Sequence, residues 1–501
     1  MLTRLKDNGF KNLVDVDVRF GPFTCIAGQN GVGKSNLFDA IKFLSALADQ
    51  PLMDAASSVR GERGRSTDVR QLFHRVGDEY DPLMTIEAEM VVPREAIDDL
   101  GQLATASATF LRYTIELAYR GGGALDSSGT LEIRREQLVH VRQNERARQL
   151  QFPHSVKDWR KSAIRTVHRS APYISTAAGE NGTVILVHQD GGSRGKPLPR
   201  PAEKLPRTVL SASNAAESPT VTVAKKEMQS WRLMQLEPSA LRKPDDFGAQ
   251  PEIAASGDHL PSTLYHLARL PTNGRTSQLS GTQHRGSAVY AKVANRLAEL
   301  IDDVRQIWVD PDEKREILTL NVQDRTGTTY SARSLSDGTL RFLALAVLES
   351  DTDTQGLLCL EEPENGIHPR RIPAMLRLLE DIAVSVDEPV SNENPLRQVV
   401  INTHSPVVVK EIVDDSLLVA ELIQGVRAGK RFSELQLSCL QDTWRAKSGE
   451  SAVTSRGSLL AYLNPNMQLG DLDFSEKSCI RRRRVMDRPD VQGLLAFASE
   501  E

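Results

Sequence analysis

A glycine-rich stretch near the N-terminus carries residue types that bind phosphate groups. Residues 28–35 read Gly-Gln-Asn-Gly-Val-Gly-Lys-Ser and fit the pattern G-x-x-x-x-G-K-[ST]. Glycines let the backbone curl so that its N–H groups point at phosphate oxygens, and the start of a following helix adds partial positive charge. We expect Lys34 to bridge the β- and γ-phosphates of a nucleotide and the Ser35 hydroxyl to ligate Mg²⁺.

The elements on either side of this loop have the order that such a site needs. Residues 23–27 form an apolar run that predicts a buried strand. Residues 36–44 predict a helix, because Leu37, Ala40, Ile41 and Leu44 recur at helical spacing and form one apolar face. The sequence therefore predicts a strand, a phosphate-binding loop and a helix.

Two acidic residues follow a second apolar strand. Residues 356–360 are apolar or small, and Glu361 and Glu362 come directly after them. At the carboxyl edge of a parallel sheet, such carboxylates lie beside a bound nucleotide. One can hold Mg²⁺, and the next can polarise an attacking water. Alone, the pair is equally typical of a solvated strand end.

Two further motifs flank the acidic strand in sequence. Residues 334–341 place a Ser-x-Gly turn at the start of an apolar helix, where a hydroxyl and free N–H groups can meet an anion. A buried strand at 399–403 ends at His404, which could contact a γ-phosphate if this strand lies beside the acidic one. A capped helix and a structural histidine would explain each motif separately, but the order of all four favours nucleotide hydrolysis.

This set of motifs resembles the ABC-type ATPase heads of the SMC/RecF/OLD group. The spelling of the motif after the acidic strand is most similar to the OLD-like ATPases of bacterial anti-phage defence systems. The similarity covers residues 1–120 and 255–415. The segments that carry it are Gly9-Phe10-Lys11-Asn12-Leu13, residues 28–40, Leu335-Ser336-Asp337-Gly338-Thr339, Glu361-Glu362-Pro363-Glu364-Asn365-Gly366-Ile367-His368-Pro369 and Thr403-His404-Ser405.

The resemblance implies an ATPase in which two heads enclose two ATP molecules with Mg²⁺. The implied catalytic residues are Glu362 as general base, His404 as γ-phosphate sensor and Lys34, and the implied metal ligands are Ser35 and Glu361. A glutamine that couples Mg²⁺ to the rest of the head is also implied, with Gln71 and Gln151 as candidates. The implied ATP contacts are Gly28, Asn30, Gly31, Gly33, Lys34, Ser35 and Asn36 of one head, and Ser336 and Gly338 of the other head.

The predicted fold is α/β, a P-loop NTPase of ABC-ATPase type with a mixed central sheet. An antiparallel β-meander lobe is expected from strands at 84–92, 110–119 and 130–141. We expect the N-terminal half of the head at 1–150, an inserted arm at 151–254, the C-terminal half at 255–425 and a C-terminal region of unknown role at 426–501. The arm has no heptad repeat, which argues against a long coiled coil.

Composition excludes some classes of protein. The 501 residues are 40% hydrophobic and 26% charged, with a net charge of −4. No run of eighteen apolar residues and no basic-then-apolar N-terminus is found, so we expect a cytoplasmic protein without a membrane partner. The four cysteines are far apart, and Cys25 and Cys359 fall in predicted buried strands, which favours core residues over disulfides or zinc ligands.

The function predicted from these features is an ATP-hydrolysing subunit of an anti-phage defence complex. It would act as a homodimer or higher homo-oligomer and control a separately encoded effector, a nuclease or a toxin. The alternative is a RecF-like DNA-binding ATPase of DNA repair, and DNA is a candidate partner in both cases. No intrinsic nuclease is expected, because Glu421, Asp471 and Asp473 lack the strand pattern of a TOPRIM domain. The basic run at 481–484 is either a solvated helix end or a phosphate contact.

Overall fold

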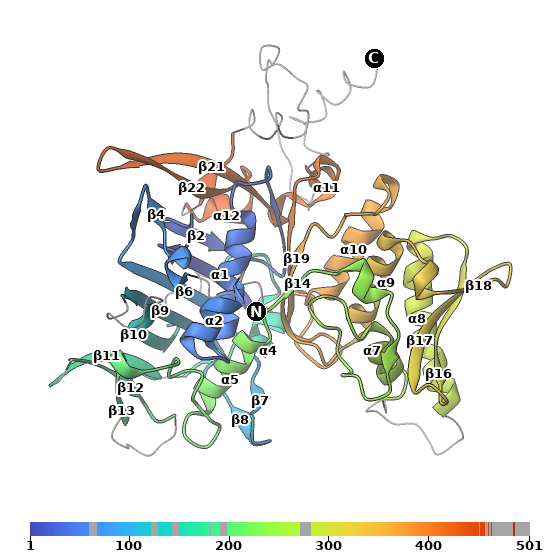
Figure 1. Ribbon diagram of the computed structural model, residues 1–501, viewed down its shortest axis with the longest axis horizontal. Coiled ribbons are helices and arrows are strands. Elements are labelled where there is room, and N and C mark those ends of the chain that lie inside the picture. The colour runs from blue at the N-terminus through green and yellow to red at the C-terminus, as the bar shows by residue number, and fades with distance from the viewer. Residues whose placement is uncertain are drawn as a thin grey trace, which may run out of the picture.

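Two large β-sheets with α-helices around them make up most of the molecule (Figure 1). The computed structural model describes residues 1–59, 68–121, 129–142, 150–167, 169, 171–180, 182–190, 198–270, 282–449, 451–455, 459, 462, 484 and 485. Within these residues no helix is long and apolar enough to cross a membrane. The mixed central sheet and the antiparallel lobe predicted from the sequence are both present.

The central sheet has seven strands. Their order is β14 (Arg232–Met234), β19 (Gly356–Glu361), β20 (Arg397–Thr403), β3 (Phe23–Ala27), β21 (Leu417–Arg427), β22 (Lys430–Cys439) and β23 (Ala452–Val453). The first five strands are parallel, and β22 runs antiparallel to β21. The carboxyl ends of β3, β19 and β20 therefore meet at one edge, which places the phosphate loop, the paired acids and His404 together, as the sequence predicts.

The second sheet is antiparallel and has eight strands. Their order is β13 (Leu198–Pro201), β12 (Gly182–Val187), β11 (Ile174–Gly179), β10 (Thr130–His140), β9 (Phe110–Arg120), β6 (Leu83–Val91), β1 (Leu2–Asn8) and β2 (Val16–Arg19). The meander predicted from the sequence corresponds to β6, β9 and β10, whose ladders run over almost their full lengths.

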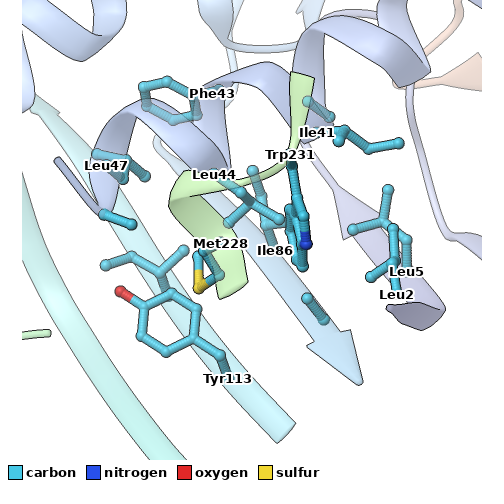
Figure 2. Close-up of a cluster of buried hydrophobic side chains, with 14 of the residues drawn as sticks. Leu2, Leu5, Ile41, Phe43, Leu44, Leu47, Ile86, Tyr113, Met228 and Trp231 are labelled. Carbon is cyan, nitrogen blue, oxygen red and sulfur yellow. The ribbon is translucent and has the colours of Figure 1, made fainter. Parts of the chain in front are cut away.

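Helix α1 (Lys34–Leu47) begins at the phosphate loop, and its residues belong to one core with both large sheets. Its predicted apolar face is buried, with Leu37, Ala40, Ile41 and Leu44 each at most 2% exposed. Figure 2 shows Leu44 and Leu47 in one cluster with Tyr113 of β9. The helix has no side-chain cap at Gly33, and a glycine at this position costs only a few tenths of a kcal/mol relative to a capping side chain. Burial of each aliphatic side chain contributes about 1.5–3 kcal/mol, so packing decides where the helix lies.

A second core lies on the other side of the central sheet (Figure 1). It contains α9 (Asp337–Ser350), in which every residue from Phe342 to Leu348 is buried. The helices that contact α9 are α6 (Pro238–Leu241), α7 (Leu260–Leu267), α8 (Thr282–Leu300) and α10 (Ile372–Ile382). The same part of the chain contains α11 (Pro406–Glu411), β15 (Asp245–Asp246), β16 (Val304–Asp312), β17 (Ile317–Asp324) and β18 (Thr329–Ser331). The remaining α-helices and strands are α2 (Leu52–Ser58), α4 (Lys161–Ala163), α5 (Pro219–Gln229), α12 (Trp444–Lys447), β4 (Arg75–Val76), β5 (Glu79–Tyr80), β7 (Glu95–Ile97) and β8 (Leu103–Thr105).

The segment expected as an inserted arm, residues 151–254, does not stand apart from the sheets. Strands β11, β12 and β13 extend the antiparallel sheet, and β14 forms the edge of the central sheet. Helix α5 lies against α1, with Val223 and Met228 in the same core. The expected boundary at 425/426 falls inside β21, whose partner β22 lies in the region expected to be separate. The physical reason is pairing at the sheet edges, because these strands form hydrogen bonds with backbone N–H and C=O groups that would otherwise have no partner in the sheet.

Candidate functional site

The phosphate loop joins the end of β3 to the start of α1. The N–H of Gly28 donates to the carbonyl of Thr403 at 3.2 Å, which ties the loop to β20. Gly33 has a φ of 110° in the left-handed region, and a Cβ there would overlap the side chain of Asn12. Asn12 donates to the carbonyl of Val32 at 3.1 Å and accepts from Asn36 at 2.7 Å, so the turn after β1 holds the loop in place.

The side chain of Lys34 lies folded back over its own loop. Its ammonium donates to the carbonyls of Gly28 at 2.6 Å and Gln29 at 2.8 Å. Burial lowers the pKa of Lys34, while the carboxylates of Glu362 and Glu364 oppose this shift. An ammonium held by two carbonyls on a phosphate-binding loop is a cation that can exchange these oxygens for phosphate oxygens.

The paired acids stand at the end of β19. Glu361 is the last residue of the strand, opposite Asn402 of β20. Glu362 adopts a left-handed backbone with a φ of 46°, and its N–H is bonded to Asn402 at 3.1 Å. Non-glycine residues rarely adopt this conformation, and such strain is concentrated at functional sites.

The Glu362 carboxylate is held by two neighbours. Oε1 lies 2.6 Å from Nδ1 of His404, and Oε2 accepts a hydrogen bond from Asn365 at 2.9 Å. Burial by itself would raise the pKa of Glu362, but the hydrogen bonds from Asn365 and His404 and the charge of Lys34 lower it below its ordinary value. Glu362 is therefore ionised at neutral pH, which is the state that a general base requires.

These residues meet in one cavity of about 600 Å³. Of the site residues expected from the sequence, Asn30, Gly31, Gly33, Lys34, Ser35, Asn36, Glu361 and Glu362 line it. Four expected residues, Gly28, His404, Ser336 and Gly338, are not part of its lining within the described chain. Gly28 and His404 nevertheless touch residues that do line it, through the bonds to Lys34 and Glu362.

A glutamine that the sequence did not single out also faces the cavity. Gln235 follows the edge strand β14, and its amide donates to Oε2 of Glu361 at 3.1 Å. The glutamine that couples Mg²⁺ to the rest of the head is expected from the sequence at Gln71 or Gln151, and neither of these lines the cavity. A signal was present, because Gln235 follows the apolar pair Leu233-Met234 as Glu361 follows the apolar residues of β19, but β14 has only three residues. Of these three glutamines, Gln235 is the one that lines the cavity.

The oxygen atoms gathered here suit a hard cation. The Ser35 hydroxyl, the Glu361 carboxylate and the amide of Gln235 belong to residues that line the same cavity. Mg²⁺ takes oxygen ligands and is commonly held by one or two protein groups together with substrate phosphates. The residue types present thus fit Mg²⁺, with Ser35 and Glu361 as the residues that would hold it.

The Ser-x-Gly turn begins α9. The Ser336 hydroxyl caps the helix by accepting from the N–H of Thr339 at 3.3 Å. Gly338 approaches the backbone of Gly366 so closely that a Cβ would not fit. Arg341, one turn further along α9, donates to the carbonyl of Asn365 at 2.6 Å. The start of α9 is thus packed against the loop that carries Glu362, while its cap residue lies outside the cavity of its own chain.

A family model and a curated relative match parts of this chain. A family model described as "AAA domain, putative AbiEii toxin, Type IV TA system" matches residues 23–177 and 197–410. The phosphonates import ATP-binding protein PhnC of Lactobacillus delbrueckii subsp. bulgaricus is 26% identical over 133 residues, covering 26% of this chain. The chain spans about half, 51%, of the length of this curated relative.

Solved structures with a similar arrangement include heads of SMC proteins. An SMC head bound to the C-winged helix domain of ScpA has a TM-score of 0.44 at 12% identity, covering 88% of this chain and 98% of that one. An SMC head with an extended coiled coil, bound to the C-terminal domain of ScpA derived from Pyrococcus furiosus, has a TM-score of 0.41 at 11% identity and covers 89% and 98%.

Proposed function

The chain belongs to the AAA-domain family of AbiEii type matched above, and we propose that it is the ATP-hydrolysing switch subunit of a bacterial anti-phage defence complex. Its P-loop fold is that of an ABC-type ATP-binding protein. The observation that carries the proposal is one cavity lined by Lys34 and Ser35 from the phosphate loop and by Glu361 and Glu362 from β19.

The residues at this site would have separate roles in ATP hydrolysis. Lys34 would release the carbonyls of Gly28 and Gln29 and bind phosphate oxygens of ATP. Mg²⁺ bound at Ser35 and Glu361 would neutralise charge that develops on the phosphates. Glu362, ionised and 2.6 Å from His404, would accept a proton from the attacking water. His404 would fix the direction of that carboxylate.

A second copy of the chain would complete the site. Ser336 and Gly338 do not line the cavity of their own chain. A helix start with a hydroxyl and free N–H groups is a suitable cap for the γ-phosphate of an ATP held on another head. We therefore propose a homodimer closed by ATP, in which each α9 caps the nucleotide bound by the other chain.

The effector would be a separate protein. Asp471 and Asp473 lie outside the described residues, so the expectation that they form no nuclease stays a prediction. The family description names a toxin and a type IV toxin–antitoxin system, which supports a role in defence over one in DNA repair.

The test begins with Lys34→Ala in a titration of ATP and Mg²⁺ by calorimetry. We expect binding to be lost, because the phosphates lose their main cation. The matched control is Lys314→Ala, at an exposed turn between β16 and β17, which should bind as the wild type does. Unchanged affinity in Lys34→Ala would refute the phosphate-loop assignment.

A phage plating assay then separates defence from repair. The chain is expressed together with its neighbouring gene, with and without Lys34→Ala. We expect protection that depends on Lys34. Sensitivity to DNA damage with no change in phage plating would instead support the RecF-like alternative.

A further inference from the structure

Glu364 lies two residues after Glu362 in the sequence but is not among the described residues that line the cavity. Its side chain is buried, with 7% of the residue exposed. Oε1 accepts a hydrogen bond from the hydroxyl of Thr403. Oε2 is buried and has no hydrogen-bond partner within the described residues. Burial of a carboxylate with one oxygen unpaired is unfavourable, so stability alone does not explain an acid at this position.

Thr403 connects this carboxylate to the loop of His404. Thr403 is the last residue of β20 and is fully buried. Its hydroxyl donates to Glu364 and accepts from the N–H of Ser405 at 2.9 Å. Because His404 lies between Thr403 and Ser405, the Glu364–Thr403 bond fixes the backbone on both sides of the histidine. The carbonyl of Thr403 also accepts from the N–H of Gly28, which brings the phosphate loop to the same point.

We propose that Glu364 is a positioning residue that sets the His404–Glu362 pair through Thr403. The inference rests on the proposed ATPase function and deepens it. Loss of the Glu364 carboxylate would then lower the hydrolysis rate without a change in ATP binding.

The test compares single-turnover ATP hydrolysis in wild type, Glu364→Met, His404→Ala and the double variant. Methionine has a similar size, so the buried space stays filled while the carboxylate is lost. We expect kcat to fall roughly tenfold in Glu364→Met with KM for ATP unchanged, which is the effect of one lost hydrogen bond in the transition state. In the His404→Ala background the same substitution should change kcat less than about twofold, because Glu364 acts through His404.

A second pair of variants keeps the test decisive if Glu364→Met does not fold. Thr403→Val removes the hydroxyl and should reproduce the loss of kcat, whereas Thr403→Ser keeps the hydroxyl and should restore the rate. Equal losses with and without His404, or a wild-type kcat in both Glu364→Met and Thr403→Val, would overturn the inference. A wild-type protein without Lys34-dependent hydrolysis would instead refute the proposed function itself.

Discussion

Replacement of Glu362 by glutamine tests the chemistry of the site most directly. Glutamine has the shape of glutamate, and its amide can accept from Asn365 while donating to an unprotonated Nδ1 of His404, so the two contacts at 2.9 and 2.6 Å are kept. The substitution therefore removes the base and leaves the surrounding structure in place. Because Lys34 and Ser35 are unchanged, ATP affinity should stay within about threefold of wild type.

The size of the effect follows from the role assigned to the carboxylate. Loss of a positioned general base lowers rates about 10²–10⁴-fold, which corresponds to about 3–5 kcal/mol in the activation barrier. The neighbours of Glu362 lower its pKa, so the base is already ionised at neutral pH. The wild-type rate should therefore lose this base only as the pH falls through that lowered pKa, and the loss in Glu362→Gln should be the same from pH 6 to pH 8.

The assay is single-turnover hydrolysis of ATP, combined with light scattering in the presence of ATP and Mg²⁺. We expect ATP-bound Glu362→Gln to accumulate as a closed dimer, because hydrolysis no longer opens it. Glu313→Gln, on the exposed β16–β17 turn, is the matched control and should behave as wild type. Turnover within threefold of wild type at saturating ATP would refute the assignment of Glu362 as the base.

Three further predictions concern the surroundings of the site and the rest of the chain. Gln235→Ala should raise the Mg²⁺ concentration needed for hydrolysis several-fold, because the amide lies 3.1 Å from Glu361, whereas Gln71→Ala should leave it unchanged; metal titrations of the ATPase rate decide between them. Burial raises the pKa of Glu136 to about 7, so the free energy of unfolding of the wild type should fall as the pH rises from about 4.5 to about 7. Denaturant unfolding should show a fall on the order of 3 kcal/mol over this range in the wild type, and Glu136→Gln should remove it. The purified chain with Mg²⁺ or Mn²⁺ should not cut plasmid DNA, and cleavage abolished by substitution of Asp471 and Asp473 would contradict the proposal of a separate effector.

The loops that carry the chemistry could be predicted because their signals are local. Runs of five mostly apolar residues, at 23–27, 356–360 and 399–403, predict β3, β19 and β20, and each ends directly at the residues that do the chemistry. Parallel strands bring their carboxyl ends to one edge, so the meeting of Lys34, Glu362 and His404 follows from the strands alone. The close approach of Asn12 to Gly33 does not follow in this way, because it depends on the turn after β1.

The short strands in the segment from 151 to 254 could not be predicted from sequence patterns. Strand β13 has four residues and contains two prolines, and β14 has three residues, so neither shows a period that can be recognised. Both lie at sheet edges, where a strand needs a partner on one side only. The role of Gln235 depends on this placement: the residue reaches Glu361 only because β14 runs parallel to β19.

The C-terminal region belongs to the head for a reason that no local pattern shows. Arg445 is fully buried in α12, and a buried guanidinium requires acceptors for its N–H groups. It finds them in the carbonyls of Arg19 at 2.9 Å and Asp415 at 2.5 Å and in the hydroxyl of Thr24 at 3.2 Å. Thr24 lies within β3, which leads into the phosphate loop, and Asp415 comes shortly before β21, the strand paired with β3. The region expected to be separate therefore supports the strands beside the site. Its place in the fold depends on hydrogen-bond acceptors near the N-terminus, the carbonyl of Arg19 and the hydroxyl of Thr24, which are far away in the sequence.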